Sequence, residues 1–345
     1  MPTLLVSARI RDAFGDALCA AGAAGAAGGS ALRLAVSDVH QPLSPQQLSE
    51  VDIALMTLDV IGLSTKMALT PGMQFFSEQL RAAPRLQWLH VPTAGVDRPV
   101  FQEMLRRGVR VTNSSGANAD AVAHTAIMGV MVLARGALTW IQAQREHRWA
   151  PLRGPDAPAD LAGQTAVVVG YGPIGRSIAQ FLEALGLQVH KLRHTPQAGD
   201  ATLGIQGYAE LHARVRGAQW LVIACPLTDA TRHMVDAAVL DAMPRGAFVL
   251  NVGRGGVLDE DALLAALASG HIAGAHLDVF EQEPLAADSP FWDLPNVLVS
   301  PHNAGATRQY DDRCVYMFLD NLGRWVRGEP LLQEVPRDRA LAVAP

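Results

Sequence analysis

Polar residues stand at the ends of four apolar runs in the second half of the chain, where their side chains could do chemistry together. In chain order they are Cys225 with Pro226, Arg254, the acids Asp278, Glu281 and Glu283, and His302. An arginine is permanently charged and can hold a carboxylate through two hydrogen bonds. A histidine titrates near neutral pH, and a neighbouring carboxylate favours its charged form. These residue types suit proton exchange with a small molecule that carries a carboxylate.

A glycine-rich turn lies upstream of these residues, in "AVVVGYGPIGRSIAQF". Gly170 allows a tight turn, Gly172 lets the backbone approach a pyrophosphate, and Gly175 lets the following helix pack on the strand. Pro173 and Ile174 open that helix, whose free N–H groups and positive dipole end attract phosphate. Strand, turn and helix in this order predict a dinucleotide-binding site.

The strand after this helix ends in "KLRHTP". Arg193 lies 18 residues after Gly175 (193 − 175 = 18), near the offset of about 20 residues at which an acid bonds the ribose 2′-hydroxyl. No acid occurs between residues 184 and 198. A guanidinium with neighbouring polar groups, here His194 and Thr195, suits an anionic 2′-phosphate. We therefore expect NADP(H) as the preferred cofactor, with NAD(H) as the second; the alternative is that this segment is an ordinary solvated loop.

Short runs rich in Val, Ile and Leu alternate with amphipathic segments along the chain. They predict strands buried on both faces, as in parallel sheets covered by helices. The runs lie at 3–8, 32–36, 52–58, 86–91 and 109–114, and then at 165–170, 187–193, 220–225, 247–253, 274–279 and 296–301. Long helical stretches at 119–148 and 307–328 join the two sets. The Ala/Gly segment 20–30 is expected to be a helix end that runs into a loop.

This alternation predicts an α/β protein with two doubly wound parallel-sheet domains. A Rossmann dinucleotide-binding domain at 116–303 is inserted in a flavodoxin-like substrate domain made of 1–115 and 304–345. The cleft between the domains is the expected site. Hinges for domain closure are expected near Ser115–Gly116 and Ala304–Gly305.

Composition excludes several other classes of protein. With 345 residues, 49% hydrophobic and 18% charged, the chain suits compact folded domains, and its net charge of −5 gives no reason to expect nucleic acid or an anionic membrane as partner. Cys19, Cys225 and Cys314 are odd in number and lack metal-ligand spacing, which predicts a reducing compartment without structural disulfides or a metal. The start of the chain has no basic leader, and the longest apolar stretch, at 126–140, is too short to span a bilayer. We expect a cytoplasmic protein.

Eight motifs follow one another over most of the chain. They are "PTAGVD" (92–97), "VTNSSGANADAVA" (111–123), "GYGPIG", "CPLTDATRHMV", "NVGRGG", "DVFEQEP", "PHNAGAT" and "NLGRWVRGEPL" (321–331). In this combination and order the chain resembles the D-isomer-specific 2-hydroxyacid dehydrogenases. The resemblance implies an oxidoreductase that transfers a hydride between a nicotinamide cofactor and a 2-keto or 2-hydroxy acid.

The resemblance also assigns roles to single residues. It implies that Arg254 binds and polarises the substrate, that His302 is the acid/base, and that Glu283 supports the histidine. The backbone amides of Ala94 and Gly95 would hold the substrate carboxylate. Further contacts to the cofactor are implied for Cys225, Pro226, Thr231, Val252, Gly253, Asp278, His302 and Ala304, with Asp278 meeting the nicotinamide carboxamide. Taken singly, each residue has a structural alternative, such as a helix cap, a solvated loop acid or a turn.

The chain departs from its relatives in a few places. His124 stands where a glutamate is usual, in a helix (119–140) that the resemblance places at a homodimer interface. Glu283 separates the chain from formate dehydrogenases, where glutamine supports the histidine, and "PTAGVD" lacks the lysine of a phosphite-oxidising relative. Arg193 resembles the NADP-preferring glyoxylate/hydroxypyruvate reductase branch, so reduction of small 2-keto acids is predicted. His90, His124 and His276 are expected to be structural.

Two other functions stay open on the sequence. A reductase of bulkier or aromatic 2-keto acids would use the apolar side chains of "LMTLDVIG" and those near Trp140 and Trp149. A non-enzymatic, corepressor-like dinucleotide sensor would keep the same residues and bind NADP(H) without turnover.

Overall fold

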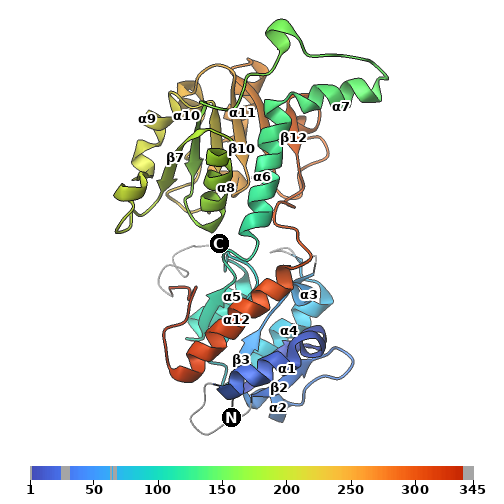
Figure 1. Ribbon diagram of the computed structural model, residues 1–345. Helices are drawn as coiled ribbons and strands as arrows, with labels where there is room; N and C mark the ends of the chain where they lie inside the picture. Colours follow the sequence, from blue (N-terminus) through green and yellow to red (C-terminus); the bar gives the residue numbers. More distant parts are fainter. Residues whose placement is uncertain (1, 25–31, 63, 65–67, 337–345) are drawn as a thin grey trace. The chain divides into compact units, whose positions relative to one another are not determined.

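The structure is a computed structural model that describes residues 2–24, 32–62, 64 and 68–336. Its contacts divide the chain into two units, residues 1–117 with 307–345 and residues 118–306 (Figure 1). The sequence predicts these borders at 115/116 and 303/304. The second unit is therefore an insertion in the first. It stays a prediction that the first unit binds the substrate and that the second unit binds the cofactor.

The first unit is built on a five-stranded parallel sheet of order β2-β1-β3-β4-β5. Its strands are β1 (Thr3–Ser7), β2 (Arg33–Ser37), β3 (Val51–Leu55), β4 (Trp88–Val91) and β5 (Arg110–Asn113). This is the flavodoxin-like strand order. Its helices are α1 (Ala8–Ala24), α2 (Pro45–Ser49), α3 (Leu58–Ile61), α4 (Pro71–Ala82), α5 (Pro99–Arg106) and α12 (Tyr310–Arg327).

The two faces of this sheet belong to two apolar clusters. Because neighbouring residues of a strand point to opposite faces, Leu5 packs with α4 and α5, whereas Leu4 and Val6 pack with α1 and α12. Helices α1 and α12 lie side by side on that second face although they come from opposite ends of the chain (Figure 1). Helix α1 ends at Ala24, and residues 25–30 of the predicted Ala/Gly loop lie outside the described residues.

The second unit is built on a seven-stranded parallel sheet of order β12-β11-β10-β9-β6-β7-β8. Its strands are β6 (Thr165–Val169), β7 (Gln188–Arg193), β8 (Ile205–Gly207), β9 (Trp220–Ile223), β10 (Ala247–Asn251), β11 (Ile272–Leu277) and β12 (Val297–Val299). The order reverses between β6 and β9, as in a Rossmann sheet with one added strand, and ligands bind beyond the carboxyl ends of strands at such a point. Two doubly wound parallel-sheet domains are thus confirmed.

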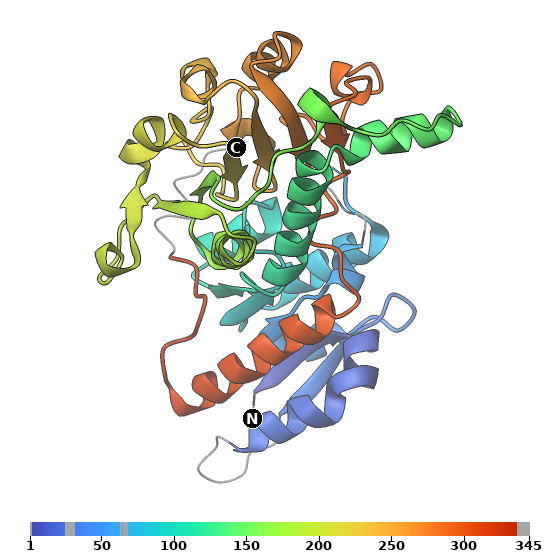
Figure 2. The ribbon, with the colours of Figure 1, turned by 45° about the horizontal axis from the view of Figure 1, so that its top comes forward.

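Helices cover both faces of this second sheet (Figure 2). They are α6 (Ala119–Ala134), α7 (Ala137–Arg145), α8 (Pro173–Ala184), α9 (Leu211–Val215), α10 (Ala237–Ala242) and α11 (Glu260–Ala268). Val168 and Val222 pack with α6 and α8, whereas Val167 and Val249 pack with α9, α10 and α11.

All eleven predicted runs overlap a strand, but two features differ from the prediction. The short edge strand β8 was not predicted, since three residues carry too little pattern. The helical stretch predicted at 119–148 is two helices, because Gly136 takes a left-handed φ of 66° and starts α7 in a new direction. Among the described helices none is long and apolar enough to cross a membrane by itself; α6 and α7 pass only as a bent pair, by length and composition.

Candidate active site

The glycine turn between β6 and α8 is shaped for a ligand. Gly170 has a φ of 103°, and a Cβ there would lie 2.6 Å from the Cys225 nitrogen, so no other residue fits. A Cβ on Gly175 would lie 2.0 Å from the Gly170 oxygen, which shows how closely helix and turn pack. Around Gly172, by contrast, a Cβ would meet no atom within 4 Å, and this residue begins α8 without a side-chain cap. The open space in front of the helix N-terminus fits a pyrophosphate.

Arg193 lies at the end of β7 beside this turn, as the sequence predicts, but its guanidinium already has partners. Its Nη2 donates to the Tyr171 oxygen at 3.1 Å, and its Nη1 donates to both carboxylate oxygens of Asp200, at 3.1 and 3.3 Å. His194 and Thr195 are exposed next to it, with 3.0 Å between Nδ1 and Oγ1. Sequence reasoning missed Asp200, because this acid lies two residues beyond the acid-free segment that ends at residue 198.

Further predicted cofactor residues gather at the ends of β9 and β10, next to the turn. Cys225 is buried, and burial raises the pKa of its thiol to about 11, so it stays neutral at pH 7. Thr231 donates from its hydroxyl to the Pro226 oxygen at 2.8 Å and shapes the loop after β9. Val252 is buried, and a Cβ on Gly253 would lie 2.6 Å from the Cys225 oxygen. The two strand ends are therefore in backbone contact.

Arg254 follows β10 in an extended conformation, and its side chain is exposed. The side-chain amide of Asn251 donates to the Arg254 oxygen at 3.1 Å, which fixes the backbone of the arginine. The next residue, Gly255, packs against Phe280 so closely that a Cβ would lie 1.8 Å from the Phe280 carbonyl carbon. This contact brings the arginine-bearing turn to the segment that carries Glu283.

His302 and Glu283 form a pair, with 2.7 Å between Nδ1 and Oε2. An ionised carboxylate only accepts hydrogen bonds, so the imidazole proton lies on Nδ1 and Nε2 is left for exchange with a substrate. Burial alone would raise the pKa of Glu283, but the hydrogen bonds from His302 and from the Phe280 N–H outweigh it and lower that pKa. Both side chains are partly exposed, so a small molecule can reach the pair.

Asp278 is 1% exposed, and it binds the loop that carries His302. Its Oδ1 accepts from the Ser300 hydroxyl at 2.5 Å and from the Asn303 N–H at 2.9 Å, and its backbone oxygen accepts from the His302 N–H at 2.8 Å. These bonds fasten the loop that holds His302 at a φ of 50°. The buried residue Ala304 is fastened by the same carboxylate.

Ala94 and Gly95 lie in the first unit, directly after β4. The Ala94 oxygen accepts from the Asn113 side chain at 2.9 Å, and the Gly95 oxygen accepts from the Thr93 hydroxyl at 2.7 Å. In a trans peptide the N–H points away from the C=O. The Gly95 N–H, one of the two amides that the resemblance assigns to a carboxylate, is therefore turned away from the Asn113 side chain.

Of the two predicted hinges, one falls on a poor position for bending. Ala304 is buried and bonded to Asp278, and a Cβ on Gly305 would lie 2.3 Å from the Asn118 side chain, so this pair is packed inside the second unit. The other pair, Ser115–Gly116, stands at the end of the first unit, where Gly116 has a φ of 99°.

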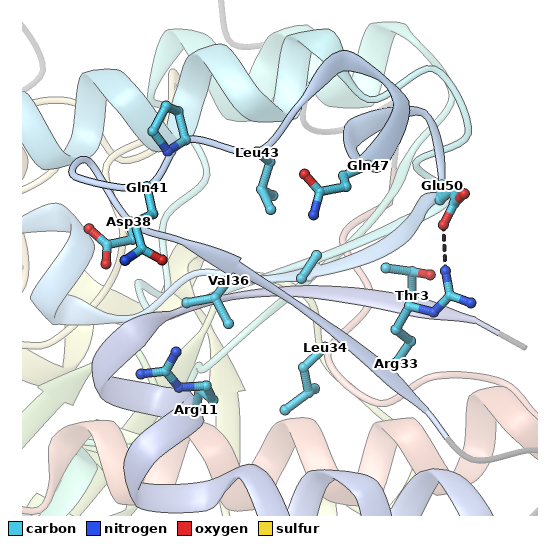
Figure 3. A pocket seen from close by; sticks show the side chains of 12 residues that line it. Thr3, Arg11, Arg33, Leu34, Val36, Asp38, Gln41, Leu43, Gln47 and Glu50 are labelled. Carbon is cyan, nitrogen blue, oxygen red and sulfur yellow. Dashed lines mark hydrogen bonds and ion pairs between the residues drawn. The ribbon is translucent and has the colours of Figure 1, made fainter.

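A pocket of about 460 Å³ lies in the first unit, beside the edge strand β2 (Figure 3). Thr3, Arg33, Val36 and Gln47 are among the residues that line it, and it contains none of the predicted site residues. Among the described residues, no group of three or more His, Cys, Asp or Glu side chains is placed to hold a metal ion. Cys19, Cys225 and Cys314 are free thiols.

Comparisons with known proteins agree with the motifs. Residues 127–304 match the profile of the NAD-binding domain of D-isomer specific 2-hydroxyacid dehydrogenases. A glyoxylate reductase from Korarchaeum cryptofilum is 33% identical over 258 residues, which cover 73% of this chain and 77% of the relative. A crystal structure of a D-isomer specific 2-hydroxyacid dehydrogenase from Xanthobacter autotrophicus Py2, in complex with NADPH and MES, is 32% identical with a TM-score of 0.72 and covers 98% of this chain and 99% of that one. An NADPH-dependent glyoxylate/hydroxypyruvate reductase from Sinorhizobium meliloti, solved with NADP and sulfate, is 26% identical with a TM-score of 0.70 and covers 98% and 99%.

Proposed function

Because this chain belongs to the D-isomer-specific 2-hydroxyacid dehydrogenase family and is therefore an enzyme, we propose that it reduces a small 2-keto acid of the glyoxylate or hydroxypyruvate kind to the D-2-hydroxy acid. NADPH is the preferred reductant and NADH the second. The observation that carries this proposal is the His302–Glu283 pair, which leaves Nε2 free at the strand ends that ligands use. Glyoxylate reductases among the relatives support the substrate class.

Each of the chain's own residues has one task in this reaction. The nicotinamide, when bound, supplies the hydride. His302 gives the proton from Nε2 to the carbonyl oxygen of the keto acid, and Glu283 stays ionised, so that it accepts from Nδ1–H and orients the imidazole. Arg254 binds the carboxylate of the substrate and polarises its carbonyl. The resemblance assigns the backbone amides of Ala94 and Gly95 to the substrate carboxylate.

The cofactor is held by residues of the second unit. The open space at Gly172 and the N-terminus of α8 take the pyrophosphate. Arg193, with His194 and Thr195, meets the 2′-phosphate, a choice that agrees with relatives solved with NADPH or NADP. The buried hydrogen bonds of Asp278 support a role in holding the loop that carries His302. The predicted contact of Asp278 to the carboxamide could use only a lone pair of Oδ2 that accepts no other hydrogen bond.

Initial rates of NADPH and NADH consumption over glyoxylate, hydroxypyruvate and phenylpyruvate test the proposal. We expect the highest kcat/KM with NADPH and the two small acids. His302→Asn should lower kcat by roughly 10² to 10⁴, the usual contribution of a general acid. Glu283→Gln should lower it too, whereas Glu281→Gln, whose side chain pairs with His233 at 2.7 Å, should change it far less.

The outcomes separate the alternatives. Faster turnover of phenylpyruvate would favour the bulkier substrates. Binding of NADP(H) without consumption of any keto acid would favour the sensor and remove the catalytic assignment. Equal rates for Glu283→Gln and Glu281→Gln would contradict the role of the His302 pair.

We also propose a homodimer that buries the outer face of α6 and α8. Met128 and Met131 on α6 are 47% and 38% exposed, and Phe181 on α8 is exposed beside His124, with 5.3 Å between the ring centroids. Apolar side chains gathered in this way mark contact surfaces. Light scattering should give twice the mass of the chain, and Met128→Lys with Met131→Lys should give the monomer. The cytoplasmic location stays a prediction.

A further inference from the structure

The ion pair between Arg193 and Asp200 lies at the expected position of the adenosine 2′-phosphate. The two side chains are 17% and 8% exposed, so water screens them little. Nη1 of Arg193 faces both carboxylate oxygens, and Nη2 faces the Tyr171 oxygen. An arginine has five N–H donors, so these bonds leave at most three for a ligand.

Asp200 also closes the loop after β7. Its Oδ2 accepts from the Gln197 N–H at 2.6 Å, and its backbone oxygen accepts from the Ile205 N–H at 2.9 Å. His194 and Thr195 lie in the closed loop, on its exposed side. The carboxylate is therefore a fixed part of the loop, and a ligand that reaches Arg193 meets it at short range.

The Asp200 carboxylate affects the binding of a 2′-phosphate and the binding of a 2′-hydroxyl differently. A phosphate monoester carries a charge of about −1.5 to −2 at pH 7. The repulsion between Asp200 and that charge offsets part of the attraction of Arg193 for it. A 2′-hydroxyl is neutral, so its binding depends little on the net charge of the pair.

We propose that Asp200 is a specificity-determining residue that moderates the preference of this site for NADP(H) over NAD(H) by offsetting the charge of Arg193. The inference rests on the proposed function, namely that Arg193 meets the 2′-phosphate. With Asp200 beside Arg193, the site accepts both cofactors. Its preference for NADP(H) is smaller than the preference that an arginine without an acidic partner would give.

The neutral variant Asp200→Asn removes the charge, and its amide NH₂ then faces Nη1 of Arg193 in place of one carboxylate oxygen. The bond from Nη2 to the Tyr171 oxygen stays, so Arg193 remains beside the glycine turn. The amide oxygen of asparagine can still accept from the Gln197 N–H and keep the loop closed. What is removed is one buried negative charge at about 3 Å from the guanidinium.

Calorimetric titration of the purified protein with NADP⁺ and with NAD⁺ provides the test. We expect Asp200→Asn to raise the ratio Kd(NAD⁺)/Kd(NADP⁺) by about fivefold or more, because fivefold is the top of the range for solvent-exposed ion pairs and water screens this pair less. Glu210→Gln is the matched control, because it removes the same charge from a carboxylate that pairs with Arg214 at 3.6 Å, and it should leave the ratio within about twofold. In an Arg193→Ala background, Asp200→Asn should still raise the ratio, because the carboxylate repels a 2′-phosphate with or without the guanidinium; the double-mutant cycle gives the part of the effect that depends on the pair.

The titrations distinguish a failure of this inference from a failure of the proposed function. A ratio that stays level or falls in Asp200→Asn, while Arg193→Ala lowers it, would overturn the inference and leave the proposed function intact. If Arg193→Ala leaves the wild-type ratio unchanged, the 2′-phosphate assignment and the inference both fail. Asp200→Ser, whose hydroxyl can accept from the Gln197 N–H, must raise the ratio as well and provides the measurement should Asp200→Asn not fold.

Discussion

Both carboxylate oxygens of Asp278 accept a hydrogen bond from the backbone N–H of Ala304, at 3.1 and 3.0 Å. The same buried carboxylate accepts from the Asn303 N–H and from the Ser300 hydroxyl. Three donors on one loop thus converge on one side chain, and His302 lies within that loop. Asp278 acts on the proposed acid/base through the backbone that presents it.

We expect Asp278→Asn to lower kcat by about 10²-fold, the cost of a displacement of about 1 Å at a reacting group. The amide NH₂ would face N–H donors, so part of the loop loses its anchor. Asp241→Asn, on the exposed side of α10, is the control with the same charge change. Steady-state rates and cofactor titration distinguish the roles: a loss confined to cofactor affinity, with kcat kept, would instead favour the contact to the carboxamide.

Acid should destabilise the first unit through His90. The imidazole is fully buried between Thr112 and Ser114, at 2.7 and 2.9 Å, and burial lowers its pKa to about 3. In the unfolded chain that pKa is about 6.5. Below pH 6.5 the unfolded state therefore binds a proton at His90 that the folded state does not bind. The contribution of the neutral imidazole to the free energy of unfolding is present at neutral pH and is lost as the pH falls from 6.5 toward 3.

Between pH 7 and pH 5 this linkage should remove about 2 kcal/mol from the free energy of unfolding of the first unit. Hydrogen exchange followed by mass spectrometry reports the two units separately at each pH. His90→Gln, which cannot titrate, should flatten the dependence in the first unit. In the second unit burial lowers the pKa of His276 to about 4, so that unit should keep its own loss. An unchanged slope in the variant would show that other groups carry the effect.

A third prediction concerns Gly129 on α6. A Cβ at this position would lie 2.1 Å from Nδ1 of the buried His276, so the helix approaches β11 over the imidazole ring. Gly129→Ala should destabilise the second unit by about 1–3 kcal/mol, as overpacking does. Denaturant unfolding measures the change, and His276→Ala in the same chain should recover part of it. Gly323→Ala on α12 should be neutral or stabilising, because only the flexible Arg327 side chain lies near it.

Most of the fold was predictable from the sequence patterns of the strands. Continuous apolar runs such as 165–170 and 220–225 are buried on both faces, a pattern that is typical of covered parallel sheets. The glycine turn was predictable for a similar reason, since Gly170 and Gly175 have no room for a side chain. The residues of the His302–Glu283 pair were identified by their motifs, although no pattern gives the distance between them.

The rest depends on where side chains meet in space. Asp200 is seven residues from Arg193, and nothing in the letters "RHTPQAGD" shows that the loop folds back to join them. Asp278 was expected to face a ligand, because its motif does not reveal three donors that come from residues 300–304. The break at Gly136 was missed since glycine is tolerated inside helices at a cost of only about 1 kcal/mol.

The last prediction separates folding from cofactor binding with two glycines three residues apart. Gly172→Ala places a methyl group where no atom lies within 4 Å, at a φ of −92° that alanine adopts freely, so the free energy of unfolding should change by less than about 0.5 kcal/mol. If the pyrophosphate uses this space, Kd for NADP⁺ should rise by about tenfold or more, since a methyl group then blocks the approach of the backbone.

Gly175→Ala should do the reverse, because its Cβ would lie 2.0 Å from the rigid backbone oxygen of Gly170 and would force helix α8 away from β6. Denaturant unfolding should show a loss of about 1–3 kcal/mol or more. Gly217→Ala, also in open space but outside the turn, is the control and should change neither quantity. A Gly172→Ala protein that binds NADP⁺ as tightly as the wild type would place the pyrophosphate elsewhere and would leave the open space without its proposed occupant.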